Sequence, residues 1–172
     1  YIVSIMAAAI VSILYSYLFY KKKMAAGEKL KIQYNKKTIV IYVIVSVLVI
    51  IFTIWTLFWG SIDISFHDND FTVEAQGWRD YTVDYEQIDS ISYKENLFQN
   101  GNDRRTNGMG NLKYGMGNFR NDIYGDYIRY THASCHSYVV MDIGGKILVV
   151  NGADDSETKR IYDTLIEKCQ MN

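Results

Sequence analysis

The stretch SYVVMDIGGKILVV, Ser137 to Val150, gives the clearest indication of the fold. Two apolar runs flank Gly144-Gly145, and a glycine pair between such runs is a strong signal for a β-hairpin. Upstream segments alternate apolar and polar residues, as half-buried strands do. These further strand candidates are 62–66, 71–75, 81–85, 88–93, 119–125 and 126–132.

The segment after this hairpin changes to a helical period. Ile161, Leu165 and Cys169 recur at i, i+4 and i+8, which predicts an amphipathic helix over about 155–169. Asp154 followed by Glu157 resembles a capping box at its start. Residues 61–172 are therefore predicted to be a mainly β domain of about seven antiparallel strands, closed by one helix as a small barrel or two packed sheets.

A polar span of residues 95–118 separates the two groups of strand candidates and has little strand pattern. It overlaps RRTNGMGNLKYGMGNFR (104–120), in which GMGN occurs twice. Neither a P-loop nor a dinucleotide-binding glycine motif is completed, which disfavours a nucleotide site. We instead expect structural glycines that supply tight turns and bulges. These glycines are Gly108, Gly110, Gly115 and Gly117.

The same stretch carries the candidate binding residues of the chain. Guanidinium and ammonium groups suit phosphates and carboxylates, so a basic glycine-rich loop is a candidate anion site. The alternative is a solvated loop whose cations pair with local carboxylates such as Asp103 or Asp122. The candidate ligand-binding residues are Arg104, Arg105, Lys113 and Arg120.

Other reactive side chains form no complete catalytic or metal motif. His132, Cys135 and His136 are metal-ligand types, with Cys169 as a fourth candidate, but neighbouring strand residues point to opposite faces. We therefore expect no metal site, no cofactor and no catalytic residues. Whether the two cysteines form a disulfide or remain thiols stays open.

Three tyrosines, Tyr124, Tyr127 and Tyr130, follow one another closely in the chain. They could form an aromatic stripe for a glycan or a peptide. Core and cross-strand packing is the favoured interpretation, because tyrosine is common in strands.

Two uncharged runs precede the β domain, about residues 1–20 and 38–60. Each has the roughly 20 apolar residues that a transmembrane helix needs, which predicts a helical hairpin as a first domain, residues 1–60. Its connecting loop, residues 21–37, holds seven lysines and one glutamate, a net charge of +6. Short basic loops stay cytoplasmic, so we expect an integral cell-membrane protein with residues 61–172 on the extracytoplasmic side.

Four stretches resemble bacterial PH-like domains, a family usually attached to membrane helices. They are YTVDYEQIDSISY (81–93), RRTNGMGN (104–111), GNFRNDIYGDYIRYTH (117–132) and KILVVNGADDSETKRIYDTL (146–165). The resemblance implies a bent sheet capped by one C-terminal helix, and no catalytic activity belongs to the family as a whole.

The expected function is therefore a membrane-anchored, non-catalytic binding or assembly module. Its expected partners are the lipid bilayer and a protein, with no nucleic acid. The alternative is a sensor of anions or lipid headgroups, or an enzyme, that uses the basic loop 104–120. The loop between the first two strand candidates, His67 to Asp70, is acidic and would repel a phosphate.

Overall fold

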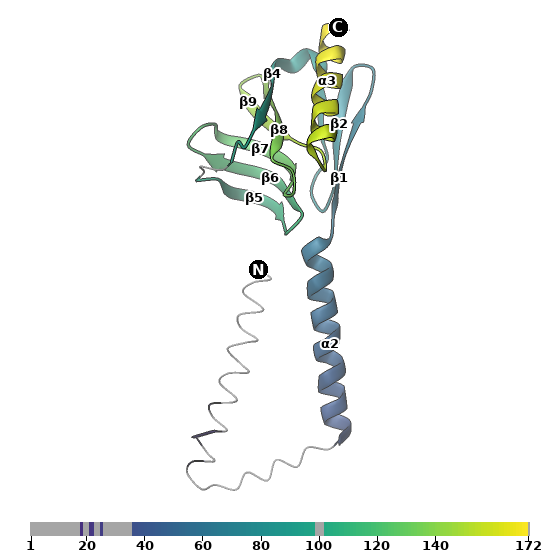
Figure 1. Ribbon diagram of the computed structural model, residues 1–172, viewed down its shortest axis with the longest axis vertical. Coiled ribbons are helices and arrows are strands. Elements are labelled where there is room, and N and C mark those ends of the chain that lie inside the picture. Colours follow the sequence, from purple (N-terminus) through teal and green to yellow (C-terminus); the bar gives the residue numbers. More distant parts are fainter. Residues whose placement is uncertain (1–17, 19–20, 23–24, 26–35, 99–101, 172) are drawn as a thin grey trace. The chain divides into compact units, whose positions relative to one another are not determined.

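The computed structural model describes residues 18, 21, 22, 25, 36–98 and 102–171 of the chain. The chain divides into two compact units, residues 1–55 and 56–172. All the strands of the described residues and the C-terminal helix belong to the second unit, and most of these elements are labelled in Figure 1.

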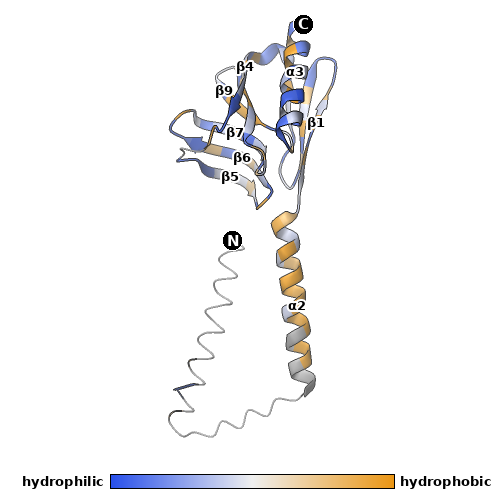
Figure 2. Cartoon of the chain, viewed as in Figure 1, coloured by the Kyte–Doolittle hydropathy of each residue, from blue (hydrophilic) through white to orange (hydrophobic). Residues whose placement is uncertain are grey.

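The long helix of the structure is α2 (Lys36–Phe58). Figure 2 shows hydrophobic residues along much of it, and described side chains such as Leu48 and Phe52 are exposed. Within the described residues, however, no helix combines the length and the hydropathy that crossing a membrane requires. The predicted transmembrane helix over about 38–60 is therefore wrong.

The other predicted transmembrane helix, about 1–20, lies outside the described residues apart from Leu18. The predictions of a membrane-spanning hairpin, an integral membrane location and a cytoplasmic loop 21–37 depended on these spans and are corrected with them.

The first sheet of the β domain has three antiparallel strands in chain order. They are β1 (Ser61–Phe66), β2 (Asp70–Gln76) and β3 (Tyr81–Asp84). Their alternating sequences place one face in the core, where Val73 and Val83 are buried. A short 3-10 turn, η1 (Tyr85–Gln87), leads to the second sheet.

The second sheet has six strands. Their spatial order is β4 (Ile88–Glu95), β8 (Ser137–Ile143), β9 (Lys146–Val150), β7 (Gly125–His132), β6 (Tyr114–Asn121) and β5 (Arg104–Gly110). The β8–β9 hairpin turns at Gly144-Gly145, as the sequence predicts. All pairings are antiparallel except β7 with β9, in which Ile128 lies opposite Leu148.

The prediction of about seven antiparallel strands is therefore wrong, because the described residues form nine strands with one parallel pair. Most of the expected loop 95–118 is also strand, since β5 and the start of β6 lie within it. A β-bulge at Thr106 interrupts the β5–β6 pairing between Arg105 and Asn107. The bulge and the glycines remove the period-two pattern that makes a strand recognisable in sequence.

The C-terminal helix α3 (Asp155–Met171) packs against β4 and β8 (Figure 1). Asp154 caps it by accepting a hydrogen bond from the Glu157 backbone N–H at 2.9 Å. The Glu157 carboxylate reaches back to the Ala153 N–H at 2.7 Å, one residue before the cap. The capping residues predicted from the sequence thus fix the start of this helix.

The main core lies between α3 and the two sheets. It contains Phe71, Met116, Tyr130, Met141 and Leu165, all fully or nearly fully buried. A second core covers the opposite face of the large sheet, around Phe119, Tyr127, Tyr138, Val140 and Val149. Strand β8 is buried on both faces for this reason, which explains its nearly continuous apolar sequence.

Candidate functional site

The doubled GMGN motif lies on the two strands of one hairpin. Gly108 pairs with Gly117, Met109 with Met116, and Gly110 with Gly115. Met116 is fully buried in the main core, and paired residues share a face, so the glycines of both strands lie on the opposite face. The repeated motif therefore produces a strip of the hairpin that carries no side chains.

Two of these glycines occupy positions that other residues could adopt only with strain. Gly108 and Gly117 have φ values of +147° and +119°. A Cβ on Gly117 would lie 2.4 Å from the Asn107 carbonyl oxygen, and one on Gly108 would lie 2.1 Å from that of Met116. Close approach of the paired backbones thus requires glycine on both strands.

The structure separates the four predicted basic residues. Arg104 lies opposite Arg120, and the two share a face of the sheet. Arg105 lies opposite Phe119, a residue of the second core, and is therefore on the other face. Lys113 lies in the turn at the far end of the hairpin, with its ammonium 5.7 Å from the Phe58 ring centroid.

Strand pairing extends the Arg104–Arg120 pair across the sheet. Asp126 of β7 lies opposite Arg120. Because Ile128 pairs with Leu148 in the parallel β7–β9 ladder, Lys146 falls beside Asp126, two residues earlier on each strand. These four residues form one row across β5, β6, β7 and β9. The row is on the sheet face that carries the main core, but it lies beyond the end of that core. The cation row, as we call Arg104, Arg120, Asp126 and Lys146, has three positive charges and one negative charge.

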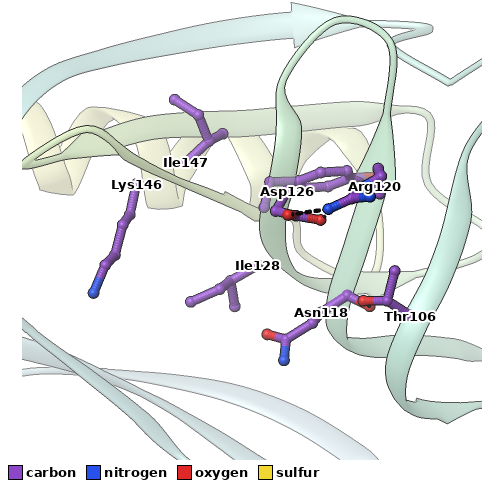
Figure 3. A pocket seen from close by; sticks show the side chains of 8 residues that line it. Thr106, Asn118, Arg120, Asp126, Ile128, Lys146 and Ile147 are labelled. Carbon is purple, nitrogen blue, oxygen red and sulfur yellow. Dashed lines mark hydrogen bonds and ion pairs between the residues drawn. The ribbon is translucent and has the colours of Figure 1, made fainter.

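An open groove of about 520 Å³ lies along the Arg120, Asp126 and Lys146 part of this row. Figure 3 shows Arg120 and Asp126 joined to each other, while Lys146 lies apart from them with Ile128 and Asn118 below the pair. The groove thus combines polar groups with apolar surface. Its lining consists of Thr106, Asn118, Arg120, Asp126, Tyr127, Ile128, Lys146 and Ile147.

Arg120 and Asp126 form a two-pronged ion pair inside the groove. The Arg120 Nε donates to Asp126 Oδ1 at 2.6 Å, and Arg120 Nη2 also bonds the second carboxylate oxygen. The hydrogen bond from Arg120 lowers the pKa of Asp126, with Arg104 contributing, and the same bond raises the pKa of Arg120. Both groups therefore remain charged across the neutral pH range.

The other two cations of the row have no such partner. Within the described part of the chain, neither Arg104 nor Lys146 makes a hydrogen bond or an ion pair, although Arg104 lies close enough to Asp126 to affect its pKa. The carboxylates that the sequence suggested for local pairing are engaged elsewhere. Asp122 accepts a hydrogen bond from Asn102 at 2.6 Å, and Asp103 pairs with Arg129.

The Asp103–Arg129 pair lies on the opposite face and belongs to the second core. Arg129 Nη1 is 2.6 Å from Asp103 Oδ2, and the two side chains are 15% and 13% exposed. The guanidinium carbon is 4.2 Å from the Phe98 ring centroid and 5.1 Å from that of Phe119. Tyr127 also donates to Asp103, and burial, followed by this carboxylate, raises the Tyr127 pKa well above its usual range. Asp103 directly precedes β5, while Tyr127 and Arg129 belong to β7, so this cluster ties the beginning of β5 to β7.

The tyrosines considered as an aromatic stripe do not share a surface. Tyr130 is buried in the main core and donates a hydrogen bond to the Arg79 carbonyl at 2.8 Å. Tyr127 lies in the second core, and Tyr124 packs against it at a ring-centroid distance of 5.8 Å.

The residues considered as metal ligands are also dispersed. Cys135 is a buried free thiol near Thr158, and burial raises its pKa. Cys169 is likewise free, and burial raises its pKa too. Burial lowers the pKa of His132, whose ring lies 5.2 Å from that of Tyr114. His136 is exposed.

Sequence reasoning missed Asp126 and Lys146 as members of the site. Both lie outside the stretch 104–120, and only the pairing of β7 with β6 and β9 brings them beside Arg120. No local motif marks them, although the glycine hairpin before Lys146 does identify where β9 begins.

Comparison of the chain with family models, with curated proteins and with solved structures finds no match. Because fold alone does not fix function, the groove itself holds the observations that bear on function.

Proposed function

We propose that the β domain is a non-catalytic binding module that holds an anionic group of its partner in the groove along the cation row. One observation carries the proposal: adjacent strands put Arg104, Arg120 and Lys146 in one row that holds a single carboxylate, that of Asp126. Residues 61–172 hold eleven Lys and Arg against eighteen Asp and Glu, a net charge of −7. Such a gathering of cations on an otherwise acidic domain favours a specific anion site.

The state of the charges supports binding of an anion. Arg120 already neutralises Asp126 through the two-pronged pair, so the positive charge of Arg104 and Lys146 is left over. Guanidinium groups bind carboxylates and phosphates through paired hydrogen bonds, while an ammonium group adds a point charge. Arg104 and Lys146 lie on the two outer strands of the row, so an anionic group can meet, at either end, a cation that is unpaired within the described residues.

The same charges argue against proton-transfer chemistry in the groove. A general acid or base works best with a pKa near the operating pH. The Asp126 pKa is lowered and the Arg120 pKa is raised, so both move away from neutrality. The nearby Tyr127 is buried, and its pKa lies far above its usual range.

The test is a titration of the full chain with citrate and with tripolyphosphate, small anions that differ in chemistry but share high charge. NMR signals of Arg104, Arg120 and Lys146 side chains are expected to shift saturably, and the affinity is expected to fall as salt concentration rises. Arg104→Ala and Lys146→Ala should each weaken binding by about fivefold, the value for an exposed ion pair.

The substitution Asp126→Asn is expected to change the anion affinity in the opposite direction. It removes the one carboxylate of the row, so anion affinity is expected to increase. Lys94→Ala is the matched control, because it removes an exposed cation from β4, at the other edge of the same sheet. The proposed site is refuted if substitutions at Arg104, Lys146 and Asp126 leave the anion affinity unchanged. It is also refuted if Lys94→Ala changes the affinity as much as they do.

A further inference from the structure

We infer that the partner presents its anionic groups on an extended acidic segment that pairs with the free edge of β5. The inference rests on the proposed anion site and names the class of partner that would occupy it. The surface concerned is the β5 edge, meaning the side of Arg104–Gly110 that faces away from β6. An extended peptide can add a strand to such an edge through main-chain hydrogen bonds.

The β5 edge is unsatisfied within the described residues. β5 ends the six-stranded sheet, and β6 is its only strand partner there. Outside the regular elements of the described chain, no backbone hydrogen bond involves a residue of 104–110. Residues 104–107 and Gly110 are exposed. Alternate N–H and C=O groups along this edge are therefore available to a guest strand.

Within the described residues, the domain has three other edge strands besides β5. They are β1 and β3 in the small sheet and β4 at the other end of the large sheet. Strand β4 packs one face against α3, where Tyr93 and Tyr162 meet edge to face at 5.8 Å between ring centroids. Strands β1 and β3 carry no lysine or arginine, and β4 carries one, Lys94. Because β5 carries two consecutive arginines, it is the edge strand best suited to an acidic guest.

The positive charges beside the β5 edge favour a guest strand with acidic side chains. Arg104 and Arg105 are consecutive and point to opposite faces of the sheet. A guest strand alternates its side chains in the same way, so two neighbouring acidic residues would meet one arginine each. On the Arg104 face, Arg120 and Lys146 continue the positive surface into the groove. A basic guest would be repelled by the same residues.

The glycine strip sets the position of the Arg105 side chain. Beyond Arg105, the face opposite the main core carries only Gly108 and Gly110 on β5, with Gly115 and Gly117 behind them on β6. Arg105 extends along this strip, with Nη1 within 1.7 Å of where a Cβ of Gly110 would stand. The absence of side chains at Gly108 and Gly110 thus lets the Arg105 guanidinium lie along β5, beside the edge that a guest strand would occupy. The expected guest therefore has an acidic pair near Arg104 and Arg105.

The test measures binding of a short peptide with a glutamate pair at each end and alternating valine and threonine between them. The acidic pair at both ends allows either strand direction. With the full chain, we expect saturable binding in fluorescence anisotropy and slower hydrogen exchange of β5 amides that face away from β6. Arg104→Ala and Arg105→Ala should each weaken binding by about fivefold, whereas Lys94→Ala should leave it unchanged.

Two control peptides separate strand pairing from charge. Lysine in place of every glutamate should abolish binding. A central proline keeps the charge but removes main-chain hydrogen bonds, so it should weaken binding by about tenfold. Equal affinity of the proline peptide would overturn strand pairing and leave the anion site standing.

The citrate and tripolyphosphate titration distinguishes the remaining failures. Anion binding at Arg104 and Lys146 without binding of the acidic peptide would refute the extended guest alone. If neither the anions nor the acidic peptide bind, the proposed function fails, and the inference that depends on it fails too.

Discussion

Replacing Gly117 by alanine is expected to destabilise the β5–β6 hairpin severely. Gly117 has φ +119°, and a Cβ there would lie 2.4 Å from the Asn107 oxygen and 2.6 Å from the Gly108 Cα. The backbone strain costs about 1–3 kcal/mol. Overpacking against a neighbouring backbone adds about 1–3 kcal/mol, because no flexible side chain can move aside. The sum is about 2–6 kcal/mol. This is a large part of the unfolding free energy of a typical domain, which is about 5–15 kcal/mol.

The matched control is Gly125→Ala. Gly125 also has a positive φ, +65°, but nothing lies within 4 Å of the position of its Cβ. Only the left-handed backbone conformation is then unfavourable, at about 1–2 kcal/mol. The comparison therefore shows how much the close approach of the two strands and the larger φ of Gly117 add to the cost of an ordinary left-handed conformation.

Urea unfolding of the full chain, followed by near-ultraviolet circular dichroism, gives both free energies of unfolding. Gly117→Ala is expected to lower the transition midpoint well below that of Gly125→Ala, with a similar slope. If Gly117→Ala is no more destabilising than Gly125→Ala, the paired glycines do not hold the hairpin strands in the close contact described above.

Three further predictions concern other parts of the domain. Gly110→Ala should displace Arg105 and weaken acidic-peptide binding while leaving the urea midpoint nearly unchanged, since the obstructing atom belongs to a flexible side chain. Asp103→Ala should cost about 3 kcal/mol of unfolding free energy by leaving the Arg129 guanidinium without its counter-ion, and adding Arg129→Met should recover part of that loss in a double-mutant cycle. Burial lowers the pKa of His132, so the unfolded state binds a proton first as the pH falls below about 6.5. The free energy of unfolding should therefore decrease as the pH falls from about 6.5 to the pKa of His132 in the folded state. His132→Gln should reduce this pH dependence of the urea midpoint.

Local signals explain what was predictable in this fold. Gly144-Gly145 between two apolar runs predicted the β8–β9 hairpin, because a tight turn depends on the backbone freedom of the turn residues themselves. Asp154 and Glu157 predicted the start of α3, because their side chains bond to backbone groups only a few residues away. Each of these features is decided by neighbours in sequence.

The uncharged runs show the limit of composition. The absence of charge over about 38–60 suggested a membrane span, yet no helix among the described residues is long and apolar enough to form one. Strand β5 shows the converse error. Its glycines and the bulge at Thr106 erase the alternation of a strand, and only pairing with β6 makes the segment extended.

The sequence by itself determined the hairpin, the capped helix and the period of most strands, and it drew attention to the basic residues between 104 and 120. The tertiary structure alone decided that Arg104 and Arg120 form one row with Asp126 and Lys146, while Arg105 and Lys113 point elsewhere. The physical reason is that a sheet row joins residues from strands far apart in the chain. Which strands become neighbours depends on burying the whole core, and no short stretch of sequence records that choice.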